Sequence, residues 1–166
     1  NIACATCHSH ELGGSDGLSL GIGEGGAGIG LKRTAGIGDD KIKKRVPRNA
    51  LALWNLGFKD ITTLLHDGRV TKSNIFGNGF NTPAQEALPK GLNNIVAVQA
   101  LFPMTRQFEM AGNPGENEII GLVSKVGKDS MRIDRVWPVI THRIRGIPEY
   151  VELFKNGFDD VDSALD

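Results

Sequence analysis

Five residues near the start of this chain, Cys4-Ala5-Thr6-Cys7-His8, carry most of what its sequence says about its fold. They contain the only two cysteines among 166 residues, in the C-x-x-C-H pattern by which haem is attached covalently. Two thiols add to the two vinyl groups of haem, and the two intervening residues let one helical turn present both. The adjacent histidine then supplies the proximal ligand of the iron. The sequence therefore predicts haem c bound through Cys4, Cys7 and His8.

Two other uses of a C-x-x-C pair fit the sequence less well. A thioredoxin-like redox pair opens a helix after a strand in a βαβ unit, and no such pattern surrounds Cys4. A zinc site needs about four ligands, and no second cysteine pair is present. Covalent haem predicts an oxidising, extracytoplasmic location such as the periplasm. The missing signal peptide and the motif close to Asn1 favour a processed or partial product.

Composition excludes several classes of protein. The chain has the length of one domain, 19 basic and 19 acidic residues, and a formal net charge of zero, so we expect no nucleic-acid partner. No apolar run approaches the roughly 18 residues of a membrane span. Eleven of 22 glycines fall between Gly13 and Gly38, and aromatic residues make up only 6%. A bound cofactor is one source of the missing core volume.

Periodicity predicts an all-α, cytochrome c-like haem domain with long glycine-rich loops, spanning residues 1–166 as part of a larger two-haem protein. Residues 11–46 show no periodicity and are predicted to be a loop wrapping the haem. The G-x-G-x-x-G match within it, Gly21 to Gly26, has no strand before it and no helix after it, which argues against a dinucleotide site. No strands are expected. Helical or short ordered segments are predicted at 48–58, 60–65, 92–102, 116–126, 129–144 (interrupted near Pro138), 148–154 and from about 159 onward.

Further motifs follow the haem motif in a fixed order. They are Asp16-Gly17-Leu18-Ser19, Pro47-Arg48-Asn49-Ala50 with Leu53 and Asn55, His66-Asp67-Gly68-Arg69-Val70, Gln99-Ala100-Leu101-Phe102-Pro103 and Glu109-Met110. This combination resembles the bacterial di-haem cytochrome c peroxidase family, which includes the methylamine-utilisation haem enzymes. The resemblance implies two cytochrome c-like domains, of which this chain is similar to the N-terminal, peroxide-reacting one. No second C-x-x-C-H is present, so the electron-entry haem is absent or lies on another polypeptide.

The resemblance also implies the residues that react with peroxide. Glu109 matches the distal glutamate, which takes a proton from the bound peroxide and returns it to the leaving oxygen. Gln99 matches a distal glutamine that hydrogen-bonds the oxygens or a water. The alternatives are an exposed glutamate and a polar residue on the outer side of the 92–102 helix.

Three more residues are implicated with open alternatives. Asn49 resembles a calcium ligand between the two haems, and a helix cap is the slightly favoured alternative. Arg48 could pair with a haem propionate or could be a plain surface charge. His66 stands where many family members have a tryptophan between the haems, so inheritance of that electron route is in doubt.

Whether the iron has a sixth protein ligand distinguishes the candidate functions, because a peroxidase needs an open site and an electron carrier does not. No histidine lies between Glu11 and Pro47, so we expect a resting iron that is five-coordinate or water-bound. The resulting hypothesis is a peroxidase that reduces hydrogen peroxide with electrons from a second haem and a small donor protein, or a variant that oxidises a protein or organic substrate. The alternatives are an electron-transfer subunit capped by a methionine, with Met104 preferred over Met110 and Met131, and a structural haem domain.

Overall fold

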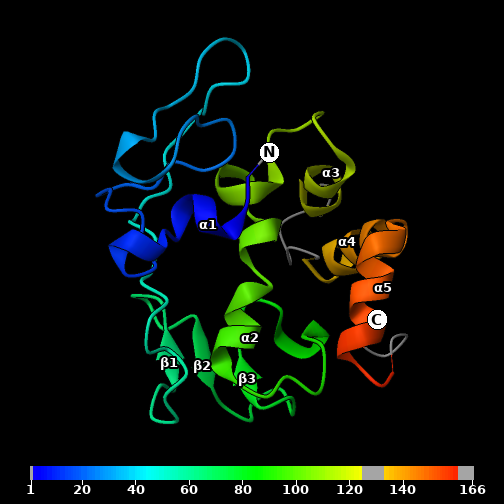
Figure 1. Cartoon of the computed structure of the whole chain (residues 1–166). Coiled ribbons are helices and arrows are strands. Elements are labelled where there is room, and N and C mark those ends of the chain that lie inside the picture. The colour runs from blue at the N-terminus through cyan, green and yellow to red at the C-terminus, as the bar shows by residue number, and fades with distance from the viewer. Residues whose placement is uncertain (1, 125–132, 161–166) are drawn as a thin grey trace.

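The computed structural model describes residues 2–124 and 133–160. In Figure 1 the glycine-rich segment lies beside α1 (Cys4–Cys7), and the strands lie at the opposite end, next to α2 (Ile95–Ala100). The helices α3 (Glu118–Ser124), α4 (Val136–Arg145) and α5 (Pro148–Gly157) lie along one side. Single turns connect them: η1 (His10–Leu12), η2 (Gly30–Lys32), η3 (Gln85–Ala87), η4 (Pro103–Thr105), the π-helical η5 (Gln107–Ala111) and η6 (Ile133–Arg135).

The expectation of an all-α fold is wrong, because residues 63–81 form a small antiparallel sheet. Its strands are β1 (Thr63–Leu64), β2 (Val70–Lys72) and β3 (Phe80–Asn81), and they lie side by side in the order β1-β2-β3. Leu64 pairs with Val70, and Lys72 pairs with Phe80. Threonine and valine suit a pleated, half-buried surface, and Asp-Gly is a turn signal. The His66-Asp67-Gly68-Arg69 motif is therefore the loop of a hairpin.

The helix expected at 48–58 is also absent. The backbone of this stretch forms hydrogen bonds with residues of the glycine-rich segment instead. Arg48 O accepts from Gly21 N at 3.0 Å, and Ala50 N donates to Asp16 Oδ1 at 3.3 Å. Asn55 takes a positive φ of 64°, which interrupts a helix. These long-range hydrogen bonds override the weak helical pattern of this stretch.

The remaining helices lie close to their expected positions. Asn94 caps α2 by accepting hydrogen bonds from Val96 N and Ala97 N. Pro138 lies in the first turn of α4 and causes no interruption, because a proline there displaces no intrahelical donor. The helix expected from about 159 onward and part of the 129–144 segment lie outside the described residues. No helix in the described ranges combines the length and the apolar character needed to cross a membrane.

Two hydrophobic clusters hold these elements together. The larger joins the sheet to α2 through Leu64, Val70, Phe80, Val98 and Phe102, and it also includes Ile133. The smaller joins Ala111 to α3 and α4 through Ile119, Ile120 and Val136. Between the larger cluster and α1 the core is interrupted by a cavity.

Candidate functional site

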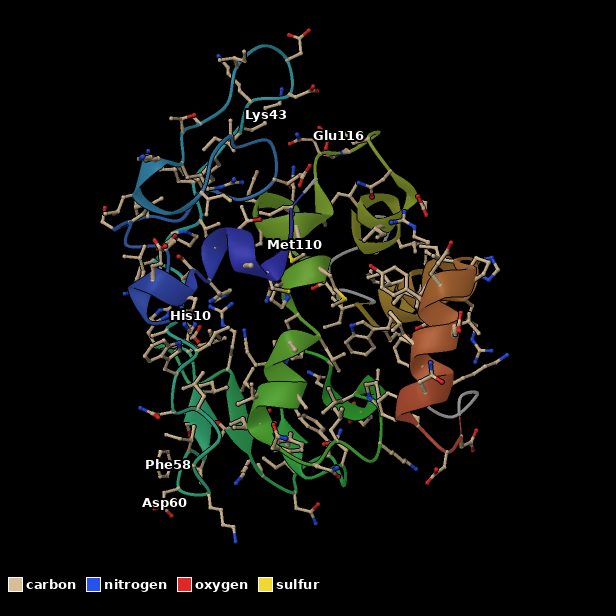
Figure 2. All side chains as sticks on the ribbon, viewed as in Figure 1. His10, Lys43, Phe58, Asp60, Met110 and Glu116 are labelled. Atoms are coloured by element: carbon tan, nitrogen blue, oxygen red, sulfur yellow. The ribbon has the colours of Figure 1, made fainter. Side chains whose placement is uncertain are left out.

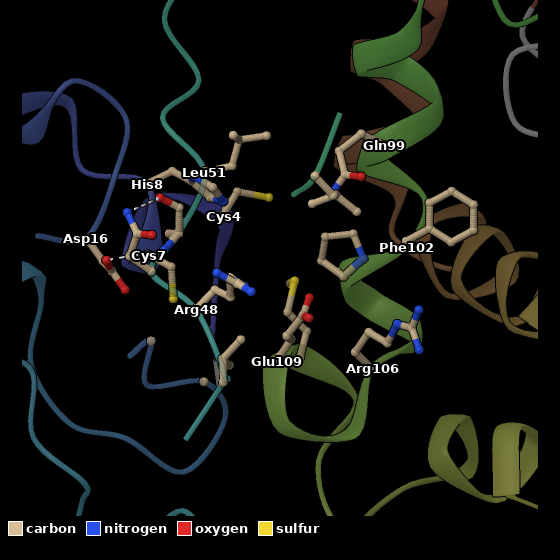
Figure 3. A pocket seen from close by; sticks show the side chains of 18 of the residues that line it. Cys4, Cys7, His8, Asp16, Arg48, Leu51, Gln99, Phe102, Arg106 and Glu109 are labelled. Carbon is tan, nitrogen blue, oxygen red and sulfur yellow. Dashed lines mark hydrogen bonds between the residues drawn. The ribbon is translucent and has the colours of Figure 1, made fainter. Parts of the chain in front are cut away.

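A cavity of about 400 Å³ lies between two walls of different construction. One wall, here called the proximal wall, consists of α1, the glycine-rich segment 11–46 and residues 47–52. The other, the distal wall, consists of residues 95–111. Figure 3 shows Cys4, Cys7, His8 and Arg48 on the first side and Gln99, Arg106 and Glu109 on the second. A volume of this size is in the range of sites that bind small molecules and cofactors.

The proximal wall presents the C-x-x-C-H motif to the cavity. The helical turn α1 carries Cys4 and Cys7, both of which are free cysteines lining the cavity. His8 Nδ1 lies 2.8 Å from Gly14 O. A carbonyl oxygen only accepts, so Nδ1 carries the proton and Nε2 keeps a lone pair. This is the tautomer and the orienting hydrogen bond that a metal-ligating histidine requires.

Burial keeps the Cys7 thiol protonated. Its pKa is raised chiefly by desolvation, against the attraction of the Arg33 guanidinium, and Asp16, Glu109 and Cys4 raise it further. The Cys7 thiol donates a long hydrogen bond to Ile22 O at 3.6 Å. Cys7 therefore lies in the cavity as a neutral thiol, held against the glycine-rich segment.

The distal wall presents one face of a broken helix. Gln99, Phe102, Pro103, Arg106, Glu109 and Met110 all line the cavity, and they recur every three or four residues through α2, η4 and η5. Gln99 Oε1 is buried and has no hydrogen-bond partner within the described structure. Buried polar atoms are nearly always satisfied, so an orphan aimed at a cavity indicates a missing ligand.

Glu109 lies in the π-helical turn η5, a backbone form that is rare and frequent at functional sites. Burial raises the pKa of its carboxyl, while the positive charges of Arg106 and Arg69 act to lower it. A carboxyl with a raised pKa exchanges protons closer to neutral pH, which suits general acid–base work.

The two walls are fastened to each other at Glu109. Glu24 N donates to Glu109 O at 2.9 Å, and a Cβ on Gly23 would lie 1.9 Å from Phe108 O and 2.6 Å from Glu109 O. Only glycine therefore allows this approach. This contact fixes the position of the η5 turn relative to the glycine-rich segment.

Arg33 holds the glycine-rich segment in the shape that this contact needs. Its guanidinium is buried and donates to Ile22 O at 2.7 Å, Gly23 O at 2.6 Å and Gly28 O at 2.8 Å. Hydrogen bonds from Asn113 lower the pKa of Glu116 in the loop before α3, and the charge of Lys43, from the glycine-rich segment, adds to this effect; both residues are labelled in Figure 2. The long segment is thus anchored by one buried cation and ordered against the distal wall.

The structure places the other predicted residues around the same cavity. Arg48, Asn49 and His66 all line it, and Figure 3 shows the Arg48 side chain directed into it. Asn49 starts no helix, so the capping alternative is wrong. The calcium prediction gains no support: the described residues contain no cluster of three or more His, Cys, Asp or Glu that could hold a metal ion.

The sequence reasoning assigned no role to Asp16, Arg69 or Arg106, all of which line the cavity. Asp16 is fully buried; its Oδ1 accepts from Leu18 N and Ala50 N, and its Oδ2 has no partner within the described structure. Arg106 could have been found from its helical spacing to Gln99 and Glu109. Asp16 belongs to one of the ordered motifs, but its role could not be read from them, because its partner Ala50 is far away in the sequence.

The hairpin loop fixes Arg69. Its Nε donates to both carboxylate oxygens of Asp67, at 2.9 and 2.8 Å, and these hydrogen bonds lower the pKa of Asp67 to about 2. Asp67 thus remains ionised at any physiological pH. It orients a guanidinium that adds positive charge near Glu109.

Met104, the methionine preferred as an alternative iron ligand, does not lie at the cavity. Met104 packs against the smaller hydrophobic cluster and does not line the cavity, which argues against it as an iron ligand. Met110 does line the cavity, next to Glu109 in the chain. Met131 lies outside the described residues.

The residues around the cavity fit a haem. Two thiols and an imidazole of the correct tautomer lie on one wall, and an unsatisfied amide oxygen lies on the other. Apolar side chains, among them Ile22, Leu51 and Phe102, also line the cavity. Cys4 and Cys7 would hold the macrocycle covalently, His8 would bind its iron, and Arg48 is available to a propionate.

Comparison with known proteins supports the same conclusion. The family model of the di-haem cytochrome c peroxidases matches residues 1–165. Searches of curated proteins and of solved structures each returned no match. The match confirms the resemblance seen in the ordered motifs, and the chain belongs to the di-haem cytochrome c peroxidase family.

Proposed function

We propose that this chain is the peroxide-reacting domain of a haem peroxidase. Membership of the family implies haem c as its cofactor, and the family is one of peroxidase-type or electron-transfer proteins. The observation that carries the proposal is the pairing across one cavity of the Cys4, Cys7 and His8 wall with Glu109 and Gln99. The reaction is the reduction of hydrogen peroxide, H₂O₂ + 2e⁻ + 2H⁺ → 2H₂O.

The bound haem supplies the one-electron chemistry, and the protein supplies position and protons. His8, held by Gly14 O through Nδ1, would bind the iron through Nε2. The Glu109 carboxylate takes a proton from the incoming peroxide and, as the acid, returns it to the leaving oxygen. Gln99 can contribute as hydrogen-bond donor through Nε2 and as acceptor through the unsatisfied Oε1.

The surrounding charges suit this role. Arg69 and Arg106 offset the negative charge of ionised Glu109, while burial favours its protonated form. In this proposal the two electrons come from a second haem and a small donor protein, and covalent attachment of the haem would require an oxidising compartment such as the periplasm.

The test is Glu109→Gln in the haem-loaded protein. We expect kcat/KM for hydrogen peroxide to fall about 10²- to 10⁴-fold, because an amide cannot exchange the proton. Glu118→Gln is the control, since Glu118 pairs with Arg143 on the exposed surface of α3 and α4. A Glu109→Gln variant within threefold of the control would contradict the proposal.

A methionine-capped electron carrier is the second candidate, and Met110 in the cavity is the observation that favours it. Electron paramagnetic resonance of the resting ferric protein separates the two. A high-spin axial signal supports an open site. A low-spin signal that becomes high-spin in Met110→Leu would establish the capped carrier instead.

A further inference from the structure

Arg33 is a buried cation in the proximal wall, and no acidic side chain neutralises it. The residue is 7% exposed, and its three hydrogen bonds go to the carbonyls of Ile22, Gly23 and Gly28. No carboxylate of residues 2–124 or 133–160 forms an ion pair with it. Proteins usually pair a buried charge with an opposite one, because taking it out of water is costly. Carbonyl dipoles solvate this guanidinium but leave its full positive charge inside the protein.

The guanidinium of Arg33 and the sulfur of Cys7 share one hydrogen-bond acceptor. Ile22 O accepts from Arg33 Nε at 2.7 Å and from Cys7 Sγ at 3.6 Å. A single carbonyl group therefore connects the cation with one of the two cysteines that would hold the haem covalently. The charge of Arg33 thus lies close to the place where the edge of the macrocycle would be attached.

Arg33 lies behind the part of the proximal wall that faces the cavity. Ile22 and Gly23 are both buried and line the cavity, whereas Arg33 itself does not line it. A Cβ on Gly26 would lie 2.4 Å from Ile22 Cγ2 and 3.0 Å from Arg33 Nη2, so glycine at this position leaves room for the guanidinium. Charges in a buried environment of low effective dielectric are screened much less than charges in water. The positive charge of Arg33 therefore acts on whatever occupies the cavity.

The buried carboxyl of the same wall is occupied elsewhere. Asp16 is 1% exposed and lines the cavity. Its Oδ1 accepts from Leu18 N and Ala50 N, and its Oδ2 has no hydrogen-bond partner within the described structure. The proximal wall thus contains one buried cation and one buried carboxyl that are not paired with each other.

We infer that Arg33 raises the reduction potential of the haem attached to this chain. When ferric haem takes up one electron and becomes ferrous, the site loses one unit of positive charge. A buried cation beside the site favours the form with the smaller positive charge, which is the reduced one. The inference rests on the haem c of the proposed function, and it adds a residue that favours the arrival of electrons from the second haem.

The experiment compares Arg33→Gln with Arg33→Lys in the haem-loaded protein, by optical redox titration at pH 6. Both substitutions replace the guanidinium and its hydrogen bonds, but only lysine keeps a positive charge. We expect the equilibrium constant for reduction to fall on the order of tenfold in Arg33→Gln, a shift of about 59 mV to lower potential. In Arg33→Lys it should stay within about twofold of the original protein. Equal shifts in both variants would mean that packing is responsible and would overturn the inference, as would an unchanged potential in Arg33→Gln.

Lys32→Gln is the matched control, because it removes the same charge from the preceding residue. Lys32 is exposed, so water and salt screen its charge. We expect this variant to shift the potential by less than about a third of the shift in Arg33→Gln. A shift as large as that of Arg33→Gln would show that the total charge of the protein matters and not the buried position, and it would overturn the inference.

Asp16→Asn keeps the inference testable if the Arg33 variants do not fold. It removes a negative charge from the same wall and preserves the shape of the side chain, so the charge of Arg33 then acts unopposed. We expect the equilibrium constant for reduction to rise at least about threefold, and an unchanged or lower potential would overturn the inference.

The covalent haem content of each protein is measured first, by the mass that the haem adds to the chain. A chain that takes up no covalent haem would overturn both the inference and the proposed function. The expected shifts in a protein that does not reduce peroxide would support the inference and overturn the proposed function alone.

Discussion

The two walls of the cavity are built by opposite means. The distal wall is a short helical run in which side chains recur every three or four residues, and a single cap, Asn94, starts it. Most of the proximal wall has no regular structure, and it is held by backbone carbonyls, one buried guanidinium and glycines that allow close approach. A segment without regular structure can therefore be ordered by a few residues, on which its stabilisation then depends.

The largest effect is expected where the walls touch. In Gly23→Ala the new Cβ would meet Phe108 O at 1.9 Å, so the η5 turn and its Glu109 must move. A misplacement of about 1 Å can cost on the order of 10²-fold in rate. Peroxide turnover by the haem-loaded variant measures this.

Gly57→Ala is the matched control for that prediction. A Cβ added at Gly57 would have no atom within 4 Å, and the φ of this residue is not positive. The variant should keep turnover within twofold of the original protein. If Gly23→Ala behaves in the same way, the glycine-rich segment does not position Glu109.

An effect of similar size, on stability instead of rate, is expected from the anchor of the proximal wall. Arg33→Met removes three hydrogen bonds to backbone carbonyls. The bonds to Ile22 O and Gly23 O are buried, and the bond to Gly28 O is partly buried. We expect the free energy of unfolding to fall by about 3 kcal/mol, since hydrogen bonds from charged groups contribute roughly 1.5–3 kcal/mol each and part of the loss is recovered by water. Urea unfolding of the haem-loaded protein measures it.

The corresponding change in the distal wall is Asn94→Ala, which removes the cap of α2. Loss of such a cap costs about 1 kcal/mol. We therefore expect Arg33→Met to lower the free energy of unfolding by more than Asn94→Ala does. Equal losses would show that the proximal wall distributes its stabilisation as evenly as the helix does.

The smallest effect concerns pH. The folded protein raises the pKa of Glu109 above its ordinary value of 4.5, so the folded state binds this proton more tightly than the unfolded chain. Its contribution to stability is therefore fully present below pH 4.5 and is lost as pH rises through the raised pKa. Glu109→Gln should melt at a higher temperature than the original protein at pH 7 and show a smaller difference at pH 4.

Glu116→Gln should change the melting temperature in the opposite direction and serves as the comparison for this prediction. Hydrogen bonds from Asn113 lower the pKa of Glu116, so its carboxylate stabilises the fold above the ordinary pKa and loses this effect on acidification. The substitution should lower the melting temperature at pH 7 by more than at pH 4. The same sign for both variants would contradict the assignment of Glu109 as a destabilised, buried carboxyl.

The C-x-x-C-H pattern predicted a haem site at Cys4, Cys7 and His8 from a stretch of five residues. Gln99 and Glu109 were predicted from the resemblance to the family, and the structure brings both to one wall of the cavity. The hairpin at 63–81 was missed because its strands are only two or three residues long, too short for an alternating pattern.

The way in which the two walls meet became visible only in the folded chain. The false helix at 48–58, the buried role of Arg33, the orphan oxygen of Gln99 and the contact of Gly23 with the η5 turn all depend on residues distant in the sequence. Periodicity reports which residues share a face of one element, but it carries no information about which backbone that face will meet. In a glycine-rich segment without periodicity, the hydrogen bonds formed on folding determine the shape.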